Sequence, residues 1–202
     1  MKKLYPYLSL VTVLGILLTG PAKNAEAQKP GDVVIATVER GIAILKDPDL
    51  SGMDKFMERR DKLWAAISPL FDSTETAKRA LGPHWNAISG EQQDQFTRVF
   101  IDLLKNIYLS KTDSYSGEKI VFVREIVSGT KAKVRTHLYI NDDKKVVVDF
   151  SMHNPSGHWL AYDIQIEGVS IINNYRSQFN SFLAKQSFEE LMEDLIEKQN
   201  SL

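Results

Sequence analysis

The residues from Trp159 to Phe179 constrain the fold more than any other stretch, because a strand pattern changes there directly into a helix pattern. Apolar residues first recur at every second position, which is typical of a strand with one buried face: Leu160, Tyr162, Ile164 and Ile166. Beyond Gly168 the apolar residues follow helical spacing, and Ser170 is placed to cap that helix: Ile171, Ile172, Tyr175, Phe179, Phe182 and Leu183. The chain therefore predicts a strand that leads at once into a helix, with a continuous apolar face.

Helical patterns occupy the chain before this run. Apolar spacing predicts helices over residues 32–112, and Asp32 is a candidate cap for the first of them. Ser89-Gly-Glu-Gln92 has the form of a capping box and opens the longest apolar stripe: Phe96, Val99, Phe100, Leu103, Leu104, Ile107 and Tyr108. A second capping box, Ser187 with Glu190, predicts a last helix, so that C-terminal helices cover residues 170–198.

Strand patterns fill residues 119–167 between the two helical regions. Three alternating segments joined by turn residues precede the strand described above: Lys119–Val127, Lys133–Ile140 and Val146–Met152. Their outward positions are polar, namely Lys133, Arg135, His137 and Asp149, and inward positions include Phe122, Val148 and Phe150. We expect an α+β fold in which a twisted antiparallel sheet of about four strands is wrapped by N- and C-terminal helices.

The N-terminus predicts export. Lys2 and Lys3 precede an apolar core, and Ala25-Glu-Ala27 offers small residues for cleavage, so residues 1–27 read as a signal peptide cut near Ala27. Residues 28–202 would then form a single domain with a net charge of −3, which carries no basic excess to suggest nucleic-acid binding. The chain contains no cysteine, which excludes disulfides, thiol catalysis and a lipoprotein anchor.

Enzymatic chemistry has one candidate in this sequence. Asp163 could act as a general base in a small cone-shaped enzyme, although a carboxylate that accepts structural hydrogen bonds at the sheet edge is the favoured interpretation. The four histidines lack the spacing of a metal site, and no phosphate-binding glycine pattern occurs. We therefore expect a protein that is not an enzyme and has no metal or cofactor.

Several motifs resemble a known family. Tyr162-Asp-Ile-Gln-Ile-Glu-Gly-Val-Ser170, the following Asn174-Tyr-Arg-Ser-Gln-Phe179 and the earlier Arg79-Ala-Leu-Gly-Pro-His-Trp85 occur in the order of the Mla-type periplasmic phospholipid-binding proteins. This is the toluene-tolerance, or ABC-transporter auxiliary, family of the maintenance-of-lipid-asymmetry pathway. The pair Leu160-Ala161 departs from the family pattern, which often has a basic residue after the tryptophan.

The resemblance implies a soluble, monomeric periplasmic carrier whose apolar cavity holds the acyl tails of a phospholipid cargo. Its implied partners are an inner-membrane ABC transporter complex and an outer-membrane lipoprotein–porin complex. The residues expected to touch the tails lie on the long helix, the sheet and the C-terminal helix: Phe100, Leu103, Leu104, Tyr108, Phe122, Val148, Phe150, Tyr162, Ile164, Ile166 and Phe179.

Alternatives stay open at this point. A related branch of the family is associated with hopanoid metabolism, so the cargo could be a triterpenoid, and a periplasmic interaction module with a solid core is a third possibility. Arg176 is expected to pair with Asp163 or Glu167, or else to reach a lipid phosphate.

Overall fold

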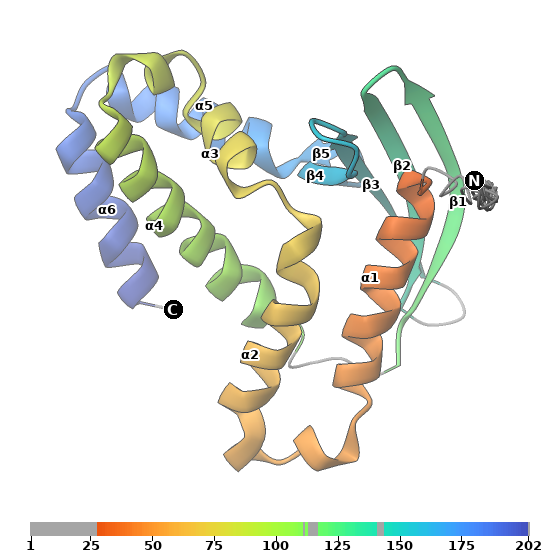
Figure 1. Cartoon of the computed structure of the whole chain (residues 1–202). Helices are drawn as coiled ribbons and strands as arrows, with labels where there is room; N and C mark the ends of the chain where they lie inside the picture. Colours follow the sequence, from red (N-terminus) through yellow and green to blue (C-terminus); the bar gives the residue numbers. More distant parts are fainter. Residues whose placement is uncertain (1–27, 111, 113–116, 141–143, 202) are drawn as a thin grey trace, which may run out of the picture.

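The computed structural model describes residues 28–110, 112, 117–140 and 144–201, so the predicted signal peptide lies outside the described residues. Within these ranges the chain runs from helices into an antiparallel sheet and back into helices (Figure 1). The helices are α1 (Pro30–Leu45), α2 (Phe56–Ile67), α3 (Ser73–Leu81), α4 (Gly90–Leu109), α5 (Ile171–Leu183) and α6 (Phe188–Asn200). The strands are β1 (Lys119–Ser128), β2 (Lys131–Tyr139), β3 (Lys145–His153), β4 (Leu160–Ile166) and β5 (Val169–Ser170). Short 3₁₀ turns join the first helices at Pro48–Leu50, Met53–Lys55, Ser68–Leu70 and Gly82–Ala87.

The sheet confirms the predicted antiparallel meander and adds one strand. Its order is β1-β2-β3-β4-β5, with every pair antiparallel. The additional strand, β5, is only two residues long, and it pairs Val169 with Ile166 through a two-residue turn. Both turn residues have positive φ, 49° at Glu167 and 81° at Gly168, as a tight hairpin of primed type requires. A two-residue strand is too short to leave a period in the sequence.

Side-chain caps define most of the helix starts. The predicted capping boxes at Ser89 and Ser187 both form, and the Ser170 side chain accepts a hydrogen bond from the Asn173 backbone as expected. The predicted cap at Asp32 is wrong, because α1 starts at Pro30 and places Asp32 in its first turn. Proline fits the first helical position, where a backbone N–H would have no partner within the helix.

The apolar core is divided into two clusters. The helical cluster lies among α3, α4, α5 and α6 and contains stacked and edge-on aromatic rings, including Phe96, Phe100 and Phe179. The sheet cluster lies where α1 covers the inner face of the strands and includes Val34, Val134 and Met152. Figure 1 shows the two assemblies side by side, with α2 running between them.

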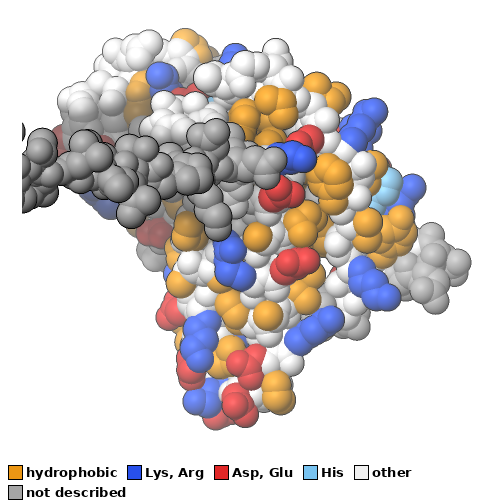
Figure 2. Space-filling model, turned by 45° about the vertical axis from the view of Figure 1, so that its right-hand side comes forward, with side chains coloured by type: hydrophobic (Ala, Val, Ile, Leu, Met, Phe, Trp, Pro, Cys, Tyr) orange, Lys and Arg blue, Asp and Glu red, His pale blue; other side chains and the backbone are white. Residues whose placement is uncertain are grey.

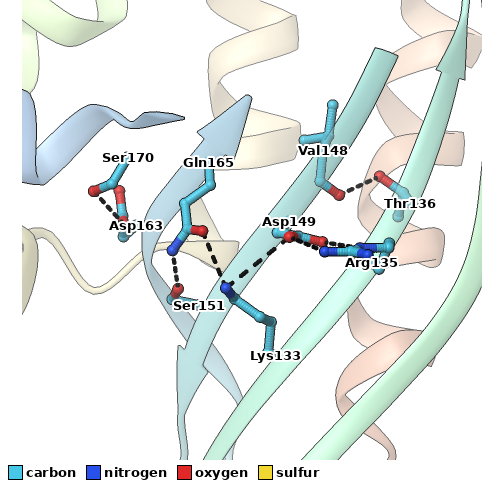
Figure 3. Close-up of polar contacts among 9 residues, drawn as sticks. All are labelled: Lys133, Arg135, Thr136, Val148, Asp149, Ser151, Asp163, Gln165 and Ser170. Atoms are coloured by element: carbon cyan, nitrogen blue, oxygen red, sulfur yellow. Dashed lines mark hydrogen bonds and ion pairs between the residues drawn. The ribbon is translucent and has the colours of Figure 1, made fainter. Parts of the chain in front are cut away.

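On the outer face of the sheet, three of the four polar residues predicted for it, Lys133, Arg135 and Asp149, are joined in a network (Figure 3). Arg135 donates two hydrogen bonds to Asp149, at 2.7 and 2.8 Å, and Lys133 donates to Gln165 at 3.0 Å. Asp149 was expected to be solvated, but it is only 3% exposed because these neighbouring side chains cover it. The Arg135 side chain, through its hydrogen bonds, holds the pKa of Asp149 below its usual range.

Exposed apolar side chains gather on β1, the edge strand of the sheet. They are Val121, Phe122, Val123, Ile126 and Val127. On the face drawn in Figure 2, hydrophobic side chains are interleaved with Lys, Arg, Asp and Glu. Phe122 was expected to face the interior, yet it is 42% exposed because an edge strand has a neighbour on one side only.

Candidate functional site

An apolar pocket lies at the seam between the helical cluster and the sheet cluster. Its volume is about 190 Å³, and its walls come from α2, α3, α4, β4 and α5. Sixteen residues line it: Trp64, Ile67, Phe71, Ser73, Thr76, Ile101, Leu104, Lys105, Tyr108, Leu109, Tyr162, Asp163, Ile164, Ile166, Ile171 and Ile172. Most of these side chains are aliphatic or aromatic, which suits a ligand made of hydrocarbon.

Both core clusters contribute to the pocket walls. Ile172 belongs to the helical cluster, and Leu104 and Ile171 pack against it. Phe71 and Ile164 pack against the sheet cluster instead. The hollow therefore lies where two separately packed cores approach one another without merging.

The strand-to-helix run from Trp159 to Phe179 builds one wall. Tyr162, Ile164 and Ile166 point toward the pocket at alternate positions of β4, and Ile171 and Ile172 follow in the first turn of α5. The opposite wall comes from α4, where Ile101, Leu104 and Tyr108 recur at helical spacing.

Five of the eleven residues expected to touch lipid tails line this pocket, and the other six lie elsewhere. Those in the lining are Leu104, Tyr108, Tyr162, Ile164 and Ile166. Phe100, Leu103 and Phe179 are buried inside the helical cluster. Phe150 is buried in the sheet cluster, Val148 packs against that cluster, and Phe122 lies on the edge strand.

The residues of α2 and of the turn after it were not among those predicted to contact the lipid tails. Trp64, Ile67 and Phe71 line the pocket there, at intervals of three and four residues. That spacing predicts one apolar helix face, but it does not say whether the face packs against protein or borders a cavity.

Asp163 has a structural role, as the favoured interpretation of the sequence expected. Its Oδ2 accepts a hydrogen bond from the Ser170 hydroxyl at 2.7 Å (Figure 3). Its Oδ1 accepts a hydrogen bond from the Ile172 backbone N–H at 3.1 Å. Both bonds are buried, and both fix the junction between β4 and α5. Each oxygen of the candidate general base is thus already engaged by the protein.

Arg176 does not form the expected ion pair. Its Nε donates to the backbone carbonyl of Arg79 at 2.6 Å, and the predicted partner Asp163 accepts hydrogen bonds from Ser170 and Ile172 instead. It lies in a second, more polar cleft that shares no lining residue with the apolar pocket: Glu75, Lys78, Arg79, Gly82, Pro83 and Arg176.

Two tyrosines near the pocket stay uncharged over a wide pH range. Burial raises the pKa of Tyr108, and the nearby Asp163 carboxylate raises it further. Burial also raises the pKa of Tyr175, whose ring packs edge-on against Phe100 at 5.0 Å. A neutral Tyr108 phenol keeps the lining compatible with an apolar ligand, whereas Tyr175 packs against the helical cluster behind it.

Metal sites and membrane-spanning helices are absent from the described residues. No three His, Asp or Glu side chains lie together there as metal ligands would, and no helix there is long and apolar enough to cross a membrane. His153 forms a pair with Asp72 at 3.0 Å and contacts the Tyr162 ring edge-on.

The fold is similar to that of a solved protein. The phospholipid-binding protein from Ralstonia solanacearum, whose structure contains a phospholipid, superposes with a TM-score of 0.76 at 24% sequence identity. The match covers 86% of this chain and 98% of that one. At this identity the likeness establishes the fold.

Sequence comparison gives the family. The intermembrane phospholipid transport system binding protein MlaC of Haemophilus influenzae is 25% identical over 131 residues, which is 62% of this chain and 61% of that protein. The family model described as "MlaC protein" matches residues 36–197, which confirms the resemblance carried by the motifs. With most of its length matched in this way, the chain belongs to the MlaC protein family.

Proposed function

We propose that this protein is a phospholipid carrier that holds acyl tails in the apolar pocket while the headgroup stays in water. The observation that carries the proposal is the pocket itself, an almost wholly apolar hollow at the seam between two cores. A chain that only needed stability would gain by closing such a hollow, because unfilled space in a core costs packing energy.

The cost of moving lipid through water explains why such a carrier is needed. Each CH₂ group moved from lipid to water costs about 0.8 kcal/mol. Two tails of roughly 16 carbons would then cost on the order of 25 kcal/mol, so unaided crossing is very slow. A protein that surrounds the tails removes most of that cost, and it needs area and shape more than directed polar contacts.

The pocket must widen to take complete tails. At about 190 Å³ it is somewhat larger than the cavity of ~150 Å³ that accommodates one benzene molecule. It is smaller than the roughly 300–1,000 Å³ of pockets that bury drug-sized ligands. The seam between the two clusters is the natural place to widen, because separating them there leaves the packing inside each cluster unchanged.

The proposed setting is the gap between two membranes. The name of the Haemophilus influenzae relative supports intermembrane transport, and the predicted signal peptide supports export to the periplasm as a 28–202 domain. We propose that the monomeric carrier, which is not an enzyme, exchanges lipid with an inner-membrane ABC transporter complex and an outer-membrane lipoprotein–porin complex. A docking partner that widens the seam would release the cargo.

Native mass spectrometry of the purified mature protein, followed by solvent extraction, tests the proposal. We expect a mass increment equal to a two-tailed phospholipid, and the extract to contain that lipid. A hopanoid in the extract would show that the protein is a lipid carrier whose cargo is a triterpenoid instead of a phospholipid. Protein that carries no lipid after purification and takes none from vesicles would overturn the proposal, in favour of a solid-core interaction module.

A further inference from the structure

The apolar pocket has one positively charged side chain among the described residues that line it. It is Lys105 of α4, between the lining residues Leu104 and Tyr108. Its Nζ lies 5.9 Å from the ring centre of Trp64, another lining residue, and 3.5 Å from Oδ1 of Asp61. A charged group among sixteen mostly apolar residues needs a reason, because taking a charge even partly out of water is costly.

The surroundings place this ammonium group at the boundary between pocket and water. The Lys105 side chain is 25% exposed, whereas that of its neighbour Asp61 is 69% exposed. A lysine in this position lays its methylene stem along the apolar wall and keeps its charge at the rim. The Lys105 nitrogen therefore marks the side of the pocket, between α2 and α4, at which a ligand changes from apolar to polar.

The present partner of Lys105 holds it weakly. The distance of 3.5 Å to Asp61 is long for a charged hydrogen bond, and the carboxylate is well solvated. A second cation lies at the same helix contact, since Arg60 of α2 donates to the carbonyl of Asn106, the residue after Lys105. Both features favour an additional anion at this rim.

We propose that Lys105 binds the phosphodiester group of the phospholipid whose tails occupy the pocket. This inference rests on the proposed function and adds the residue that recognises the phosphate: through Lys105, the carrier selects lipids with a phosphate over neutral lipids with the same tails. A lysine is a compact point charge with three donors, so it contacts the phosphate without fixing the alcohol beyond it.

The second cleft is the alternative place for a phosphate, because Lys78, Arg79 and Arg176 lie there. It is the weaker candidate, since it shares no lining residue with the apolar pocket and Arg79 is paired with Glu75. Lys78, which is exposed in that cleft, supplies a matched control variant.

The test compares two lipids with identical tails, phosphatidylglycerol and diacylglycerol, loaded from mixed micelles onto the full mature chain. Their retention is measured for wild type, Lys105→Met, Lys105→Arg and Lys78→Met. Methionine keeps the length and apolar character of the stem and removes only the charge. We expect wild type to prefer phosphatidylglycerol, and Lys105→Met to reduce that preference by about fivefold, the upper end of what one solvent-exposed ion pair contributes.

Retention of diacylglycerol should be unchanged in Lys105→Met, and Lys105→Arg and Lys78→Met should keep the wild-type preference. Equal loss of both lipids in Lys105→Met would show that the residue acts by packing alone, and loss of the preference in Lys78→Met would place the phosphate in the second cleft. Either result overturns the inference. Wild type that retains neither lipid would instead overturn the proposed function, and the inference with it.

An added arm separates a lipid phosphate from free phosphate. Excess inorganic phosphate should not displace phosphatidylglycerol, because the tails hold the lipid phosphate at the rim. If inorganic phosphate lowers phosphatidylglycerol retention to the diacylglycerol level, the site takes the free ion and the lipid assignment is wrong.

Discussion

Ser170 donates its hydroxyl hydrogen to Oδ2 of Asp163 at 2.7 Å, so that the last full strand of the sheet is joined to the first turn of α5. The same Ser170 oxygen accepts from the Asn173 backbone N–H at 2.9 Å, and the Ile172 N–H donates to Asp163 Oδ1. These groups satisfy backbone donors that a helix start otherwise leaves without a partner. The polar junction holds in place the two elements that form one wall of the apolar pocket.

We expect Asp163→Asn to destabilise the protein by about 1–3 kcal/mol, because an amide supplies only one of the two acceptor oxygens and leaves a buried donor unsatisfied. Denaturant unfolding of the delipidated variant measures this change. Ser170→Ala is the matched variant and should lose about 1 kcal/mol with the cap. A variant at Asp163 with unchanged stability would contradict the structural role and return attention to a general base.

Adjacent leucines on α4 should separate core packing from ligand binding. Leu103 is buried in the helical cluster, so Leu103→Ala should cost about 2–5 kcal/mol of unfolding free energy. Leu104 lines the pocket, where part of its surface already faces a hollow. Leu104→Ala should therefore cost less stability and reduce the amount of lipid that co-purifies.

Thermal unfolding of delipidated protein and lipid extraction from purified protein check the two leucine variants. Because the substitutions are chemically identical and adjacent, each serves as the control for the other. If both variants lose the same unfolding free energy and retain the same amount of lipid, Leu104 does not contact the ligand and the pocket is not the lipid site.

The sequence predicted the order of elements because its local signals are strong. The capping boxes at Ser89 and Ser187, the alternation along β2 and β3 and the change of period near Gly168 all correspond to structure. Each of these signals is set by neighbours within a few residues, so no tertiary information is needed to read it.

The assignment of residues to the pocket could not be read in the same way. Phe100 and Leu104 belong to one apolar stripe of α4, yet the first stacks on Phe96 and the second borders the hollow. Helical spacing identifies a face that avoids water, but not which neighbour that face meets. The division of the core into two clusters arises only when distant segments come together.

The burial of Asp149 has a consequence for acid stability. Because the hydrogen bonds from Arg135 lower its folded-state pKa, the carboxylate stabilises the fold fully above the ordinary pKa of about 3.9. That contribution is lost as the pH falls from there through the lower folded-state value. Stability measured against pH should thus decline in this acid range, and Asp149→Asn should reduce the slope of the decline.

Asp149→Asn should also cost about 1–3 kcal/mol near neutral pH, because Arg135 then loses a charged acceptor. The control is Asp194→Asn, which removes an exposed pair with Lys198 and should change stability little. If the unfolding free energy of Asp149→Asn falls with acid in the same way as that of wild type, the Arg135–Asp149 pair does not set the pH dependence of stability.

Filling the pocket from the sheet side should exclude cargo without unfolding the protein. Ile164 lines the pocket from β4, so the larger side chain of Ile164→Trp would occupy space that the tails need. Displacing contacts worth two CH₂ groups would weaken binding by ~1.6 kcal/mol, or about fifteenfold, and more if a whole tail is excluded. Val169→Trp on β5 adds the same ring at a position that is 64% exposed, and it should retain as much lipid as wild type.

Native mass spectrometry measures the phospholipid bound to each of the two variants, and circular dichroism verifies that each is folded. A folded Ile164→Trp protein that carries as much phospholipid as the Val169→Trp protein would show that the tails lie somewhere other than this seam.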